Sequence, residues 1–112
     1  MDPKLWMFDL NDEMWVILPT AALPEGLTSA LETLVIPFGS RSWSVRKYLE
    51  EWASAIENRR PGFSLGTASA GVDLLPSGDV NIVDMYGQFD DGSMAFEDFR
   101  KILEGLATAM DG

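Results

Sequence analysis

The sequence predicts one α+β domain over residues 1–112, in which an antiparallel sheet of about five strands packs against two amphipathic helices. Two patterns favour this class. Two stretches repeat apolar residues at the helical period, and several short stretches of β-branched and aromatic residues are bounded by turn residues. In addition, 46% of the 112 residues are hydrophobic, which is enough for a substantial core.

The N-terminal part of the chain predicts a β-hairpin. The stretches 4–9 (KLWMFD) and 13–18 (EMWVIL) are rich in aromatic and branched residues, and the polar pair Asn11-Asp12 lies between them. Pro19 ends the hairpin, because proline cannot donate a backbone hydrogen bond to a sheet.

Residues 27–36 allow two interpretations. Three leucines in this stretch have helical spacing, whereas its end, LVIPF, is typical of a strand. Because Pro37 prevents a helix from continuing, we favour a strand over about residues 29–36, and a helix stays open as the alternative.

Residues 43–58 carry the clearest helical pattern, with apolar residues at spacings of three and four. Ser42 is a candidate N-cap, and the run RRPG at 59–62 stops the helix. Trp52 is expected in the core, whereas Trp43 is suited equally to an exposed position and to packing at the start of the helix. The apolar stripe consists of Val45, Tyr48, Leu49, Trp52, Ala53 and Ile56.

The second half of the chain predicts another hairpin and another helix. Residues 72–75 and 80–86 flank the turn sequence PSGD, and the small polar stretch 63–70 is a candidate edge strand. The helix covers about residues 96–110, where apolar residues again keep helical spacing. Its stripe consists of Phe96, Phe99, Ile102, Leu103, Leu106, Ala107 and Met110.

The net charge is −10, and the acids concentrate in residues 1–40 and 61–112. Nucleic acid and anionic membranes are not expected as partners, because both are recognised by basic surfaces. A basic protein is the partner that such a field attracts. The chain has no cysteine, no apolar run of the roughly 18 residues that span a bilayer and no signal-peptide pattern, so we expect a cytoplasmic protein.

Few residues suited to catalysis or metal binding are present. Without histidine and cysteine, the chain lacks the usual nucleophile–base pairs and transition-metal ligands. The stretch FDDGSMAFEDF resembles the end of a calcium loop, but with Gly92 sixth, the first and third ligand positions fall on Gly87 and Phe89, which have no side-chain oxygen. We therefore expect no metal, no cofactor and no catalytic residue, although paired carboxylates remain an open chemistry.

Three stretches resemble small bacterial immunity proteins of polymorphic-toxin and contact-dependent growth inhibition systems. They are PFGSRSWSVRKYLEEWASAI (37–56), VNIVDMYGQF (80–89) and FEDFRKILEGLA (96–107). The likeness lies in the layout of short strands, a tryptophan-bearing helix after a G-S-x-S-W turn, a hairpin and a C-terminal helix. It implies a cytoplasmic protein that binds and blocks the toxin domain of its own system, for example a nuclease, and that needs no catalytic residue.

The candidate partner-binding surface is acidic and comes from the second hairpin, the turn after it and the start of the last helix. It consists of Asp73, Asp79, Asp84, Asp90, Asp91, Glu97 and Asp98. Solvated charge without a partner is the plain alternative. Glu50, Glu51 and Glu57 of the first long helix are a second candidate, offset by nearby basic residues. A non-catalytic adaptor or homodimer and a small carboxylate enzyme are alternative functions, and the oligomeric state stays open.

Overall fold

The computed structural model describes residues 6–11, 13–18, 23, 25–58, 62–84 and 92–111. In this part of the chain the fold is α+β, as predicted. The elements in chain order are β1 (Trp6–Asp9), β2 (Met14–Ile17), α1 (Glu25–Leu34), the 3₁₀ helix η2 (Ile36–Phe38), α2 (Ser42–Glu57), β3 (Ala70–Leu74), β4 (Asp79–Asp84), β5 (Gly92–Ala95) and α3 (Phe96–Met110).

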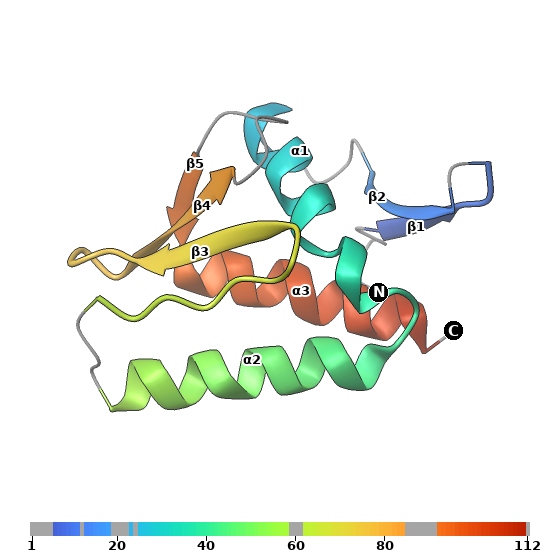
Figure 1. Ribbon diagram of the computed structural model, residues 1–112. Coiled ribbons are helices and arrows are strands. Elements are labelled where there is room, and N and C mark those ends of the chain that lie inside the picture. The colour runs from blue at the N-terminus through green and yellow to red at the C-terminus, as the bar shows by residue number, and fades with distance from the viewer. Residues whose placement is uncertain are drawn as a thin grey trace.

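The five described strands form two antiparallel sheets, and the prediction of a single sheet is wrong. One sheet is the hairpin β1–β2; in the other, β4 lies between β3 and β5. The hairpin packs against α1 and α3 instead of extending the larger sheet. Figure 1 shows it projecting at the opposite end of the molecule from the β3–β4 turn.

The strand predicted for residues 29–36 is also wrong, because this stretch belongs to α1 and η2. The helical spacing decides the outcome: Ala30, Leu31 and Leu34 form one face that is completely buried. As expected, the helix does not continue through Pro37: α1 ends at Leu34, and the proline lies in η2. The described part of the chain therefore has three α-helices, and α1 contacts every strand of the larger sheet.

The two long helices agree with the prediction and lie side by side below the larger sheet (Figure 1). Most of the predicted α3 stripe is buried, and in α2 the stripe shifts at one position. Ala53 is exposed, and Ala55 is buried in its place. Trp52 is fully buried, as expected, and Trp43, for which two positions were open, is 64% exposed.

The start of α2 is held by the end of α3. Ser42 is the first residue of α2 and not its N-cap, which corrects the prediction, and its hydroxyl donates a 2.5 Å hydrogen bond to Oδ1 of Asp111. Arg46, one turn later, forms a 2.6 Å ion pair with Oδ2 of the same carboxylate. The hydrogen bond from Arg46, and after it that from Ser42, lowers the pKa of Asp111.

A segment before β3 runs along its outer edge. The Leu65 N–H donates to the carbonyl of Val72 at 2.9 Å, and that of Leu74 donates to Phe63 at 2.8 Å. The predicted edge strand over 63–70 is therefore found as an irregular, hydrogen-bonded edge segment. Gly66 in this segment lies so close to β3 that a Cβ atom there would be 2.3 Å from the carbonyl oxygen of Ala70.

We expect Gly66→Ala to lower the free energy of unfolding by about 1–3 kcal/mol, because a backbone atom of β3 blocks the added methyl group. Urea denaturation checks this. The matched control is Gly26→Ala in α1, where no atom lies within 4 Å of the added Cβ. The control should keep the stability or raise it by up to about 1 kcal/mol, as alanine favours helix. Equal stability of the two variants would contradict the tight packing of the edge segment.

We also expect the Asp111 contacts to make stability depend on acidity. Since the pKa of Asp111 is lowered in the folded protein, its contribution is present above the unfolded value of about 3.9 and is lost as the pH falls through the folded value. Asp111→Asn should therefore lower Tm at pH 7, and the difference from the wild type should shrink as the pH falls from about 5 to 2. A difference in Tm that is the same at every pH would rule out the ion pair as its cause.

Candidate functional site

Two residues of the predicted acidic surface lie on the outer face of the larger sheet. Val72, Val80 and Ile82 point into the core, so the alternating positions Asp73 and Asp79 belong to the opposite face. Asp73 pairs in register with Asn81, two residues from Asp79, which places the two acids on neighbouring strands in a diagonal relation. Asp73 is exposed, and its carboxylate accepts a 2.6 Å hydrogen bond from the Ser64 hydroxyl.

Two further acids of this surface lie close to the same end of the sheet. Asp79 is opposite Ala95, and α3 starts at the next residue, with Glu97 and Asp98 in its first turn. Glu97 is bonded to Arg100, and this contact lowers the pKa of Glu97. Asp98 is exposed, and no described basic side chain forms an ion pair with it.

The structure thus brings Asp73, Asp79, Glu97 and Asp98 to one region, which we call the acidic sheet end. Asp84 is the last residue of β4 and pairs with Ala70. Its side chain is not among those that the structure describes. Asp90 and Asp91 fall outside the described residues. The acidic sheet end therefore contains four of the seven residues of the predicted acidic surface, and the side chains of the other three are not described.

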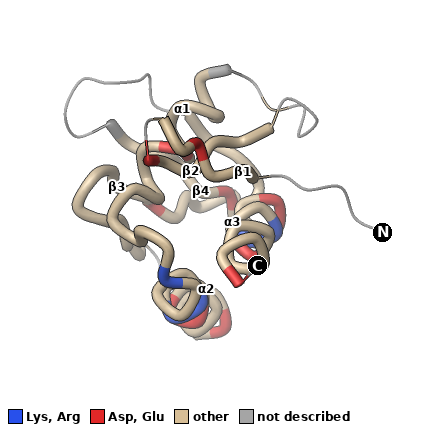
Figure 2. The backbone as a smooth tube through the Cα atoms, turned by 90° about the vertical axis from the view of Figure 1, so that its right-hand side faces the viewer, with Lys and Arg blue, Asp and Glu red and all other residues tan. Residues whose placement is uncertain are grey.

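The second acidic candidate lies on α2. Glu50, Glu51 and Glu57 are exposed, together with the basic residues Arg46 and Lys47 of the same helix. Seen from the hairpin side, Figure 2 shows acidic and basic positions together along α2 and α3. The acids of α2 are therefore interspersed with basic residues, whereas β3 and β4 contain none.

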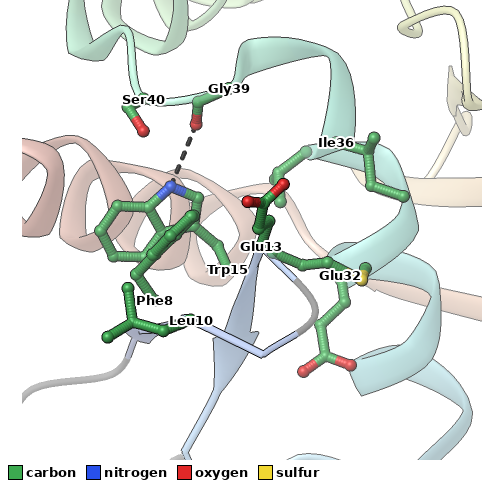
Figure 3. Close-up of a pocket in the computed structure, with 10 residues that line it drawn as sticks. Phe8, Leu10, Glu13, Trp15, Glu32, Ile36, Gly39 and Ser40 are labelled. Atoms are coloured by element: carbon green, nitrogen blue, oxygen red, sulfur yellow. Dashed lines mark hydrogen bonds between the residues drawn. The ribbon is translucent and has the colours of Figure 1, made fainter.

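A pocket that no sequence pattern indicated lies between the β1–β2 hairpin and the α1–η2 segment. It has a volume of about 330 Å³, and its walls are mainly apolar. Figure 3 shows side chains from the hairpin on one side and from η2 and the turn after it on the other. The lining residues are Phe8, Leu10, Glu13, Met14, Trp15, Glu32, Val35, Ile36, Gly39 and Ser40.

The hairpin forms this pocket because only its inner end belongs to the core. Trp6 and Ile17 face each other and are buried, whereas Phe8 and Trp15, the next pair on that face, are only half-buried. The Phe8 and Trp15 rings meet edge to face at 5.3 Å, and the Trp15 indole N–H donates a 3.0 Å hydrogen bond to the Gly39 carbonyl. That bond, drawn in Figure 3, closes one side of the pocket.

Two carboxylates line the pocket, but they do not act as a pair. Glu32 of α1 accepts a 2.7 Å hydrogen bond from the Ile17 N–H and so occupies a backbone donor of β2. In Figure 3 its carboxylate points away from that of Glu13. A glycosidase-type pair needs two carboxyl groups that face one substrate, and these two do not.

Glu13 has an unusual backbone conformation. Its φ angle is +54°, and it is the one residue other than glycine with positive φ in the described part of the chain. This left-handed conformation costs an ordinary residue about 1–2 kcal/mol. The cost is consistent with a local role for this residue, since such strain concentrates at functional positions.

Large apolar side chains are exposed at the rim of the pocket. Leu10 at the hairpin turn is 82% exposed, and Ile36 in η2 is 50% exposed. Both line the pocket from opposite sides. A single exposed apolar side chain is ordinary, but two that flank an apolar hollow form the kind of patch that marks an interaction surface.

Comparison of the chain with protein-family models, curated proteins and solved structures found no match. No three acidic, histidine or cysteine side chains in the described ranges are grouped so that they could hold a metal ion. Of the described helices, none combines the length and apolar character needed to cross a bilayer.

We expect Glu13→Gly to raise the free energy of unfolding by about 1 kcal/mol, because glycine adopts positive φ without the steric cost. Glu13→Ala is the matched control: it removes the carboxylate and keeps the strained conformation, so its stability should stay near that of the wild type. Urea denaturation of the three proteins measures the difference. A glycine variant no more stable than the alanine variant would show that the turn is not strained.

Proposed function

We propose that this protein is an immunity-type inhibitor that binds a cognate toxin domain and neutralises it without catalysis, in the cytoplasm. The observation that carries the proposal is the acidic sheet end. There, Asp73, Asp79 and Asp98 have no ion-pair partner among the described residues. The resemblance of the strand and helix layout to immunity proteins supports the same function.

The acids of this surface are suited to binding because they are preorganised. Asp73 is fixed by Ser64, and Asp79 starts the central strand of a three-stranded sheet. Little side-chain freedom is then lost when a basic partner docks. Glu97 contributes less, because Arg100 already neutralises much of its charge.

The net charge of −10 contributes to the proposed inhibition by attracting the toxin domain before contact. A strongly acidic inhibitor attracts a basic toxin domain over distances of about a Debye length, which is roughly 8 Å at physiological salt. Such attraction raises the association rate, whereas the local carboxylates fix the docked orientation. A basic substrate cleft, as in nuclease toxins, is the surface that this inhibitor would complement.

The test is co-expression with the toxin domain encoded next to this protein's gene, read out as growth. We expect the wild type to restore growth and the triple variant Asp73→Asn/Asp79→Asn/Asp98→Asn to fail. With the purified toxin domain, the same variant should lower the association rate at low salt by about tenfold or more. Failure of the wild type to restore growth would end the immunity proposal.

The matched control is Glu50→Gln/Glu51→Gln/Glu57→Gln on α2, which removes the same number of charges. We expect this variant to restore growth and to bind with a smaller loss of rate. Equal losses in both variants would mean that net charge, and not the acidic sheet end, determines binding. Circular dichroism of both variants establishes that they are folded.

A homodimer or adaptor is the second candidate, and the exposed apolar residues of the hairpin favour it. Met7 on β1 is 51% exposed, and Leu10 is more exposed still. A second copy seated on this end would remove both side chains from water. Light scattering distinguishes the two functions. If the protein is a dimer at micromolar concentration and the variant Met7→Lys is a monomer, the result favours this candidate over the monomeric inhibitor.

A further inference from the structure

We propose that the pocket between the β1–β2 hairpin and η2 is a binding site for an arginine side chain of a partner protein. This site lies on the hairpin, away from the β3–β4 turn (Figure 1), so it is independent of the acidic sheet end and of the proposed toxin inhibition. It would hold one projecting side chain of a docked segment.

The shape and the lining suit the aliphatic part of such a side chain. A volume of about 330 Å³ is at the lower end of the range for ligand pockets, roughly 300–1,000 Å³, and is large enough for one long side chain. Phe8, Leu10 and Ile36 provide apolar walls for the methylene groups. Arginine and lysine commonly bury these groups while the charged end meets a polar group.

The charge of the pocket selects a cationic end group. The Glu13 carboxylate points into the space between Trp15 and Ile36 (Figure 3), and no described basic side chain forms an ion pair with it. The Arg41 guanidinium lies beside Gly39, but it donates a 2.8 Å hydrogen bond to the Pro37 carbonyl and is not among the residues that line the pocket. Within the described ranges, therefore, no cation of the protein occupies this carboxylate, and an external cation can bind it.

The neighbours of Glu13 favour a guanidinium group over an ammonium group. Trp15 and Phe8 offer aromatic rings on which a planar cation stacks, and the Gly39 carbonyl, which accepts one bond from Trp15, has a second lone pair. Arginine can contact a ring, a carboxylate and a carbonyl together, because its donors form a fixed planar fork. The exposed Leu10 and Ile36 would pack against residues flanking that arginine and exclude water.

Nuclear magnetic resonance titration tests the site with N-acetyl-arginine-amide as the probe. The indole N–H signal of Trp15, assigned by Trp15→Phe, should move with a saturable dependence on the probe. N-acetyl-citrulline-amide, which is neutral and nearly isosteric, should give no saturable shift, and N-acetyl-lysine-amide should bind more weakly. Glu13→Gln should weaken arginine binding by about tenfold, as expected for the loss of one charge-assisted hydrogen bond.

Two internal references make the outcomes decisive. The Trp6 indole N–H, buried and bonded to the Ile102 carbonyl, should keep its position in Glu13→Gln and show that the variant is folded. Asp98→Asn, at the acidic sheet end, should bind arginine like the wild type, so that this result separates the site from the toxin-binding proposal. No shift with arginine, an equal shift with citrulline or lysine, or unchanged affinity in Glu13→Gln would each overturn the assignment.

Discussion

The burial of Trp52 is the constraint on which most of the structure depends. Its ring lies in the middle of α2, is completely buried and packs edge to face on Phe63 at 4.9 Å. It also contacts Phe96 and Phe99 of α3 at centroid distances of 5.9 and 6.1 Å. One side chain therefore joins α2, α3 and the edge segment before β3. Each such aromatic pair contributes about 0.5–1.5 kcal/mol beyond the burial of its area. Because α3 follows β5 without a loop, fixing α3 on Trp52 also fixes β5, and the pairing of β5 with β4 places Asp79 opposite Ala95, next to the start of α3.

The hairpin is attached by tryptophans at both of its ends, and the two attachments differ. At the inner end, Trp6 is buried, and its indole N–H donates a 2.9 Å hydrogen bond to the Ile102 carbonyl of α3. At the outer end, Trp15 reaches the Gly39 carbonyl while its ring stays half-buried. A rigid two-stranded hairpin held at both points leaves a space beneath its outer half, and the pocket is that space. Its existence follows from two long-range hydrogen bonds and not from any local motif.

The contrast between local patterns and long-range contacts explains which parts of the molecule could be predicted from the sequence. α2 and α3 were predictable because the positions of Leu49, Trp52 and Phe99 satisfy a strong local period, and both hairpins because their turns are short and polar. Residues 29–36 were not, because helical spacing and a branched, proline-containing end compete there, and only burial of Leu31 and Leu34 against the larger sheet decides between them. With that stretch helical, the hairpin is separated from the other strands in sequence, which splits the predicted sheet in two.

The same distinction applies to the two candidate surfaces. Asp73 and Asp79 flank one short hairpin turn, so their proximity could be predicted from the sequence. The proximity of Glu97 and Asp98 depends in addition on the pairing of β4 with β5, which no pattern in the sequence indicated. The pocket joins Glu13 and Trp15 to Ile36 and Gly39 across a fold-dependent contact, and no pattern in the sequence signals it.

Charge links the two surfaces. Arg46 and Arg100 form ion pairs within the protein, so they provide little positive charge to the exterior. The net charge of −10 makes the long-range field negative, and such a field would attract a basic partner without fixing its orientation. In the proposed interactions, orientation would come from local features, namely diagonal carboxylates on the sheet at one end and an apolar hollow with one carboxylate at the other.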